Sequence, residues 1–204
     1  MSTTTAQTRA SKARPYRLGR RAGKQGETRR RIVEAAVELH SSLGPARTTV
    51  ARIAERAGVQ RHTYYAHFPE ERDLFLACSG LALERDPLPD PEAWRALPPG
   101  RERLSRGLAD LYGWYARNAR MAACVLRDAE HHELTREMAA LRIAPVLERG
   151  AVLLGEGLGM RARALLAVAL DFHCWRAVSG ACGPEAAADL MSDAILALNP
   201  SVEG

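Results

Sequence analysis

The sequence predicts an all-α protein with an N-terminal three-helix helix-turn-helix domain and a larger helical C-terminal domain. Two observations carry this prediction. Residues 49–68 have the pattern of two short helices joined by a glycine-containing turn. The remaining chain places apolar residues at helical spacing and is interrupted by a proline-rich stretch at residues 86–100. Because 204 residues suffice for a small unit and a larger one, we divide the chain into residues 1–26, 27–72 and 73–204.

The first of the two short helices has a clear start and a clear stop. Thr48 or Thr49 can cap the free backbone N–H groups of the following turn, since threonine is a common helix-capping residue. Gly58 reaches left-handed backbone angles without strain, so the helix can end there. Between them lies one apolar stripe, formed by Val50, Ile53, Ala54 and Ala57. A second short helix fits the segment from Arg61 to His67.

The second helix carries the chemistry of a helix that enters the DNA major groove. Its first turn gathers hydrogen-bonding side chains, at the place where base edges are normally contacted. These side chains are Gln60, Arg61, His62 and Thr63. Tyr64 and Phe68, four residues apart, are placed to anchor its inner face. Tyr65 and His67 are placed to reach phosphates from the flanks.

The residues from Thr49 to Phe68 follow T-x-x-x-IA-x-x-AGV-x-x-x-T-x-Y-x-HF, which closely resembles the DNA-binding domain of TetR-family transcriptional regulators. The resemblance implies that Arg61 and His62 read bases, and that Thr63, Tyr65 and His67 contact phosphates. Gln60 replaces the family's usual Ser or Thr, and Glu71 replaces its usual Lys. The full set of expected DNA-binding residues is Thr49, Arg52, Gln60, Arg61, His62, Thr63, Tyr65 and His67.

Charge is distributed unevenly along the chain. Residues 1–75 carry 15 Lys and Arg against 7 Asp and Glu, a net charge of +8, whereas residues 76–204 have a net charge of −3. This asymmetry suits a DNA-binding N-terminal third of the chain. Residues 1–26 contain basic residues, no acid and little apolar surface, so we predict a disordered basic arm. Two roles stay open for it: an arm that follows phosphates or enters a minor groove, and a solvated tail that adds only long-range attraction.

Further helices are expected on both sides of the proline-rich segment. Before it, one helix is predicted from Glu27 to Leu43 and another from about Glu70. After it, the expected helices cover residues 101–118, 119–131, 133–154 with a bend at Pro145, 160–179, and a last one from Pro184.

The last two helices are unusually apolar. The resemblance implies that they form a dimerisation pair, which joins the partner's pair in a four-helix bundle; the alternative is an apolar monomer core. The expected dimerisation residues are Leu165, Phe172, Trp175, Leu190, Met191, Ala194 and Ile195. A dimer carries two copies of the predicted DNA-reading helix, Arg61 to His67, and two copies suit a palindromic operator.

The resemblance also implies a small-molecule effector that binds in the C-terminal domain and moves the two reading helices apart. The candidate ligand-binding residues are Tyr112, Tyr115, Met121, Asp128, His131, Met138, Phe172 and His173. For each of them, packing in the core is the competing role. The identity of the effector is not encoded in any motif, and we expect no cofactor.

Other chemistry is weakly supported. Asp128, His131 and His132 make a metal site or an acid–base enzyme conceivable, but no metal-ligand spacing, nucleophile motif or cofactor loop accompanies them. A polar N-terminus and charged residues within the most apolar run favour a cytoplasmic protein without a membrane span. The sequence thus predicts a homodimeric transcriptional regulator, most simply a repressor released by its effector. An activator or architectural DNA-binding protein of the same fold is the alternative.

Overall fold

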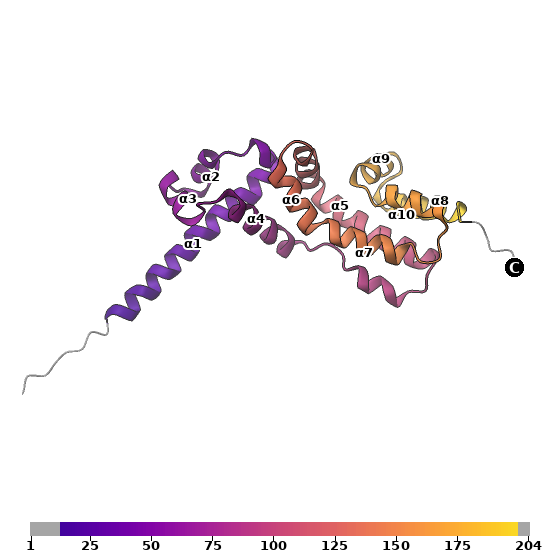
Figure 1. Ribbon diagram of the computed structural model, residues 1–204, viewed down its shortest axis with the longest axis horizontal. Coiled ribbons are helices and arrows are strands. Elements are labelled where there is room, and N and C mark those ends of the chain that lie inside the picture. Colours follow the sequence, from indigo (N-terminus) through magenta and orange to yellow (C-terminus); the bar gives the residue numbers. More distant parts are fainter. Residues whose placement is uncertain (1–12, 200–204) are drawn as a thin grey trace, which may run out of the picture.

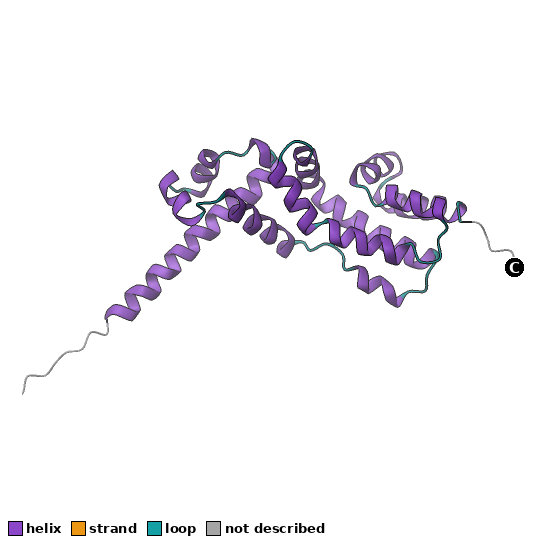
Figure 2. Ribbon diagram, viewed as in Figure 1, coloured by secondary structure: helices purple, strands orange, loops and turns teal. Residues whose placement is uncertain are grey.

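The computed structural model describes the backbone of residues 13–199 and the side chains of residues 23–183 and 186–199. All regular elements within this range are helices, joined by short loops (Figure 2). Helices α1 to α4 gather at one end of the molecule and α5 to α10 at the other (Figure 1). The predicted all-α architecture with an N-terminal helix-turn-helix is confirmed.

The N-terminal helices enclose a small apolar core. Ile32 and Ala36 face it from the first helix, Ile53 from the second and Tyr64 from the third, and all four are buried. The elements are α1 (Ala13–Ser42), the short 3-10 helix η1 (Pro45–Arg47), α2 (Val50–Ala57), α3 (Arg61–His67) and α4 (Glu71–Arg85). The predicted bounds of α2 and α3 are confirmed.

The N-terminal part of α1 corrects the prediction of a disordered arm over residues 1–26. The helix begins at Ala13, and its first half projects beyond α2, α3 and α4 (Figure 1). Once the packed part of a helix has nucleated, each added residue gains a hydrogen bond at little extra cost, so the helix extends beyond its core contacts. Residues 1–12 lie outside the described range.

The C-terminal helices pack around α5, which runs from Arg101 to Ala129. Leu104, Leu108 and Leu111 of α5 are almost completely buried against the other helices, and α10 packs along its length. The elements are η2 (Pro91–Ala96), α5, α6 (Glu133–Arg142), α7 (Ala144–Leu154), α8 (Met160–Ala169), α9 (Phe172–Cys182) and α10 (Pro184–Ala197). None of the described helices has the length and apolarity that crossing a membrane requires.

Three helix boundaries in this half differ from the prediction. Helix α5 is continuous through residues 118–119, where no Gly or Pro interrupts it. The predicted helix at residues 133–154 is two helices, because Pro145 lacks the N–H that an uninterrupted helix needs. The predicted helix at residues 160–179 also divides, because the Asp171 side chain accepts hydrogen bonds from the backbone N–H groups of His173 and Cys174 and starts α9.

Candidate nucleic-acid interface and internal cavity

Local capping fixes the turn between α2 and α3. Thr49 Oγ1 accepts a hydrogen bond from the Arg52 backbone N–H at 3.4 Å, and so caps α2 as expected. Gly58 ends the helix with a φ of 64°, in the left-handed region. The Val59 N–H then donates to the Ala54 carbonyl, which closes the turn and starts the chain towards α3.

The inner face of α3 is held by aromatic packing. Tyr64 and Phe68 are 2% and 1% exposed, and their ring centroids are 6.1 Å apart. The guanidinium of Arg29, on α1, lies 4.5 Å from the centroid of the Phe68 ring, a cation–π contact between α1 and the end of α3. No sequence pattern predicted this contact, since the two residues are far apart in the chain and belong to no shared motif. The buried rings fix which face of α3 points outwards.

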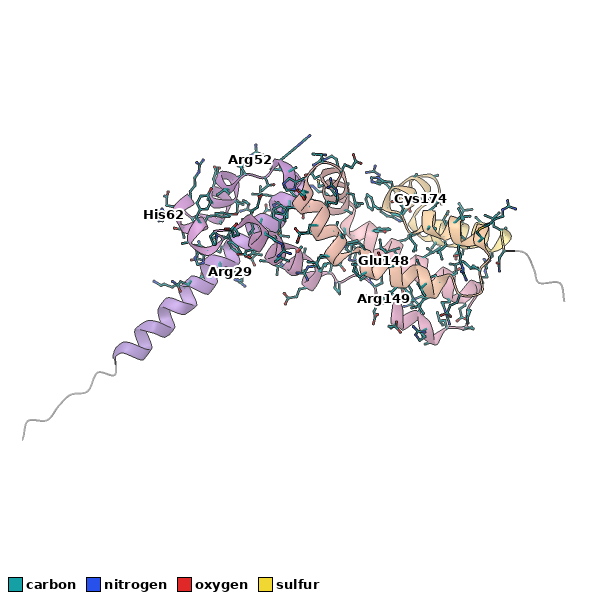
Figure 3. All side chains as sticks on the ribbon, viewed as in Figure 1. Arg29, Arg52, His62, Glu148, Arg149 and Cys174 are labelled. Atoms are coloured by element: carbon teal, nitrogen blue, oxygen red, sulfur yellow. The ribbon has the colours of Figure 1, made fainter. Side chains whose placement is uncertain are left out.

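The outer face of α3 presents the predicted DNA-contacting side chains. Gln60, Arg61 and His62 are exposed, and Tyr65 is 53% exposed. Thr63 and His67 are half-buried at the edges of the same face, and Thr49 and Arg52 are exposed on the α2 side. Figure 3 shows Arg52 and His62 at the outer surface of α2 and α3. This arrangement leaves the predicted residues accessible; their contacts with DNA stay predictions.

A cavity of about 180 Å3 lies between the two groups of helices. Its lining is mainly apolar and includes four of the eight predicted ligand-binding residues: Tyr115, Met121, Met138 and Phe172. The other lining residues are Val37, His40, Ser41, Pro45, Phe75, Cys78, Ser79, Ala82, Leu83, Trp114, Ala122, Val125, Leu126, Thr135, Ala139, Arg142, Ile143, Leu147, Leu170 and Asp171.

The other four predicted ligand-binding residues do not line this cavity. Tyr112 is buried in the core, where its hydroxyl donates to the Ala169 carbonyl at 2.9 Å. Asp128 is 1% exposed and is engaged by backbone and arginine donors. His131 and His173 lie on the surface, because the helix turns carry them away from the apolar interior.

Sequence reasoning missed the contribution of α1 to the cavity. His40 of α1 and Phe75 of α4 line it, with ring centroids 5.0 Å apart. Burial, with a smaller contribution from the charge of His132, lowers the His40 pKa to about 4, so its ring is neutral. Burial also raises the pKa of the neighbouring Cys78 thiol to about 12. The position of His40, four residues after Ala36 on the apolar stripe of α1, was the available signal.

The end of α5 is fastened to the segment between α1 and α2. Asp128 Oδ2 accepts a hydrogen bond from the Ala46 N–H at 2.9 Å, and Arg127 donates both to Asp128 and to the Leu43 carbonyl. Gly44, with a φ of 97°, lies against these two side chains. Asp128 therefore has a structural role at the junction of the two helix groups.

The alternative of a metal or acid–base site gains no support from this geometry. His132 caps α6, with Nδ1 2.7 Å from Thr135 Oγ1, and its ring stacks on Phe75 at 5.8 Å. His131 is exposed and apart from the cavity lining. Among the described residues, no three His, Cys, Asp or Glu side chains are grouped to hold a metal ion.

Four of the seven predicted dimerisation residues are core residues of the protomer, so the prediction is wrong for them. Phe172 and Trp175 pack on Tyr115, with ring centroids 5.4 and 5.5 Å away. Met191 and Ile195 are 7% and 0% exposed. These apolar side chains are buried within the protomer because α9 and α10 both pack on α5. Leu190 is 52% exposed, and Leu165 and Ala194 are half-buried, so these three stay predictions.

The helix-turn-helix region matches known regulators in sequence. Residues 32–78 match the family model described as bacterial regulatory proteins, tetR family. The transcriptional regulator TtgR of Pseudomonas putida is 49% identical over 51 residues, which are 25% of this chain and 24% of TtgR. AcrR of Shigella flexneri is 43% identical over 49 residues, which are 24% of this chain and 23% of AcrR. The chain thus matches about a quarter of the length of these curated relatives.

The fold likeness extends over most of the chain. The structure of the multidrug binding protein EbrR, complexed with imidazole, has a TM-score of 0.56 at 22% identity and covers 84% of this chain and 94% of EbrR. NalD, the secondary repressor of the MexAB-OprM multidrug efflux pump in Pseudomonas aeruginosa, has a TM-score of 0.54 at 22% identity and covers 89% of this chain and 100% of NalD. Residues 32–78, which include the capped α2 and α3, thus match the tetR family of bacterial regulatory proteins, and the fold of the chain as a whole is similar to that of EbrR and NalD.

Proposed function

We propose that the protein is a homodimeric transcriptional repressor that binds a palindromic operator and is released by a small molecule. The observation that carries the DNA-binding part is the outer face of α3. Buried Tyr64 and Phe68 hold the helix so that Gln60, Arg61 and His62 are free for base edges. The sequence relatives TtgR and AcrR are transcriptional regulators, which agrees with this role.

The effector part of the proposal rests on the cavity. Its walls come from α5 and α6 on one side and from α1 and α4 on the other, so an occupant would touch both domains at once. A ligand that repositions α1 and α4 would move α3, because Arg29 of α1 lies over the Phe68 ring at the end of α3, and Leu74 of α4 is buried in the same small core as Phe68. Dimerisation through the exposed side of α10 would set the spacing of the two α3 helices, and the regulator would act in the cytoplasm, where its operator lies.

The alternative, an architectural or ligand-independent DNA-binding protein of the same fold, makes a different prediction for DNA selected from a random pool. A repressor should enrich one palindrome with half-sites about one helical turn apart, and footprinting should protect both halves. Diffuse protection of many unrelated sequences would contradict the proposal and favour the architectural role. Operator-controlled reporter expression then separates a repressor from an activator.

A further inference from the structure

The wall of the cavity contains one arginine side chain, that of Arg142. Arg142 lies at the end of α6, and its Nη2 donates to the Leu76 carbonyl of α4 at 3.3 Å. Its Nε is shielded from solvent and has no hydrogen-bond partner among the described residues. A buried donor without an acceptor is costly in free energy, so its presence beside a cavity points to an acceptor supplied by a ligand.

The charges around the cavity favour an anion at this place. Arg142 is the cationic lining residue, because burial keeps His40 neutral. None of the ion pairs among the described side chains includes Arg142. Asp171, also in the lining, is exposed, and its Oδ1 accepts hydrogen bonds from the backbone N–H groups of His173 and Cys174 at 2.8 and 3.0 Å, at the start of α9. A ligand carboxylate beside Arg142 would pair with a guanidinium that has no ion-pair partner among the described side chains.

The geometry of a guanidinium selects a planar acceptor. Its Nε and one Nη lie on one edge and donate in parallel, which matches the two oxygens of a carboxylate. In Arg142 the Nε has no partner within the described part of the chain, and the 3.3 Å bond from Nη2 to Leu76 is long enough to be shared with a second acceptor.

The size and lining of the cavity limit the rest of the ligand. An apolar cavity of about 150 Å3 holds a benzene molecule, so about 180 Å3 suits one ring with a short chain. Phe75, Trp114 and Phe172 provide aromatic walls for such a ring.

We propose that the cavity binds a small monocarboxylic acid with a single aromatic ring or an equally compact apolar body, and that its carboxylate is held by Arg142. This inference rests on the proposed function, of which it names the effector class.

Three probes with one phenylpropyl body test the charge preference: 3-phenylpropanoate, 3-phenylpropan-1-ol and 3-phenylpropan-1-amine. Their dissociation constants are measured on the full chain by calorimetry, supported by the change in tryptophan fluorescence, to which Trp114 in the cavity wall contributes. We expect the carboxylate to bind about tenfold or more tightly than the alcohol, and the amine to bind most weakly. Equal affinities, preference for the amine, or no binding of the carboxylate at millimolar concentration would each overturn the inference.

Substitutions of Arg142 test whether this residue causes the preference for the carboxylate. Arg142→Met should bring carboxylate and alcohol to similar affinities, whereas Arg142→Lys should keep a reduced preference for the carboxylate. Arg149→Met, an exposed arginine on α7 (Figure 3), should leave all three affinities unchanged. A full carboxylate preference in folded Arg142→Met would overturn the assignment. If Arg142→Met does not fold, as judged by circular dichroism, Arg142→Gln takes its place.

Operator binding without ligand is measured separately, so the two proposals fail independently. A ranking that does not favour the carboxylate overturns the ligand class but leaves sequence-specific DNA binding in place. The expected ranking in a protein that binds no operator overturns the proposed function but supports the carboxylate site.

Discussion

Arg61 lies on the exposed first turn of α3, where a guanidinium can donate two hydrogen bonds to a guanine edge. Arg61→Ala is expected to weaken operator binding by about 1–3 kcal/mol and to relax the sequence preference at one base pair. Tyr65→Phe is the matched comparison and should weaken binding evenly for all sequences, as loss of a phosphate contact does. Competition titrations with operator variants measure both effects. An even loss from Arg61→Ala would mean that Arg61 contacts only phosphate.

His40 makes stability depend on pH. Its pKa is about 4 in the folded protein, below the ordinary value of 6.5, so between these values the unfolded chain binds the proton more readily. Stability from this group is therefore present above pH 6.5 and falls as the pH drops towards 4, by about 3 kcal/mol in total. Urea unfolding at pH 7 and pH 5 should show a smaller decrease in His40→Gln than in the wild type. The exposed His62→Gln variant should show the same decrease in stability between pH 7 and pH 5 as the wild type. If His40→Gln also shows the full wild-type decrease, His40 is not its cause.

At the scale of residues, local chemistry determined what the sequence could predict. Thr49, Gly58 and the polar first turn of α3 act on near neighbours in the chain, so their roles were readable. The cavity joins residues far apart in the sequence, such as His40 and Arg142. Neither belongs to a motif, and the apolar lining residues look like ordinary core residues. For that reason only half of the predicted ligand-binding residues line the cavity.

The link between η1 and α5 leaves no room for a side chain at Gly44. Its φ of 97° is unfavourable for other residues, and a Cβ there would clash with Arg127 and Asp128. Gly44→Ala should lower the free energy of unfolding by about 1–3 kcal/mol. Gly180→Ala, within α9 and free of neighbours within 4 Å, should instead stabilise by about 0.5–1 kcal/mol. Thermal unfolding of both variants tests whether the free energy of unfolding falls in Gly44→Ala and rises in Gly180→Ala. Equal changes in the two variants would contradict this account of Gly44.

The start of α4 departs from the family in charge. Glu71 stands where the family resemblance leads us to expect Lys. The next residue, Arg72, donates to Glu137 of α6 from Nε at 2.9 Å and from Nη2 at 2.6 Å. Because Arg72 is engaged there, we expect the basic N-terminal segment to supply the missing attraction. Glu71→Lys should tighten binding to all DNA and steepen the salt dependence by about one unit of slope.

The same expectation separates Arg72 from the N-terminal segment. Deleting residues 1–24 should weaken DNA binding more than Arg72→Ala does, in titrations at several salt concentrations. A large loss from Arg72→Ala with little loss from the deletion would show that Arg72 serves as the phosphate contact.

At the scale of elements, the presence of a helix was more predictable than the residues at which it begins and ends. Apolar periodicity located nearly every helix. It does not reveal the individual residue at which a helix ends. Asp171 divides a long apolar stretch by capping α9, although it resembles an isolated charge within a helix. In the opposite sense, α1 extends to Ala13 through a segment whose composition suggested disorder.

At the scale of the whole molecule, the exposed side of α10 is the expected dimer surface. Leu190 is 52% exposed there, so Leu190→Glu should leave the protomer folded and shift the sedimentation mass from about twice 22.3 kDa to 22.3 kDa. An isolated charge in an apolar interface is strongly unfavourable. Val152→Glu on α7, at a side chain that is 71% exposed, is the control and should keep the dimer. A folded dimer from Leu190→Glu would contradict this interface.

The cavity is walled in part by α1 and α4, which also pack against the DNA-contacting helix pair, and this affects the effector concentration that the regulator needs. Coupling between two sites is reciprocal: if the acid weakens operator affinity by some factor, the operator weakens acid affinity by the same factor. Free regulator would then capture the acid at lower concentrations than regulator on its promoter. A cell that holds more free copies per operator would need more acid to switch the gene on, so the regulator's abundance would set the threshold of the response.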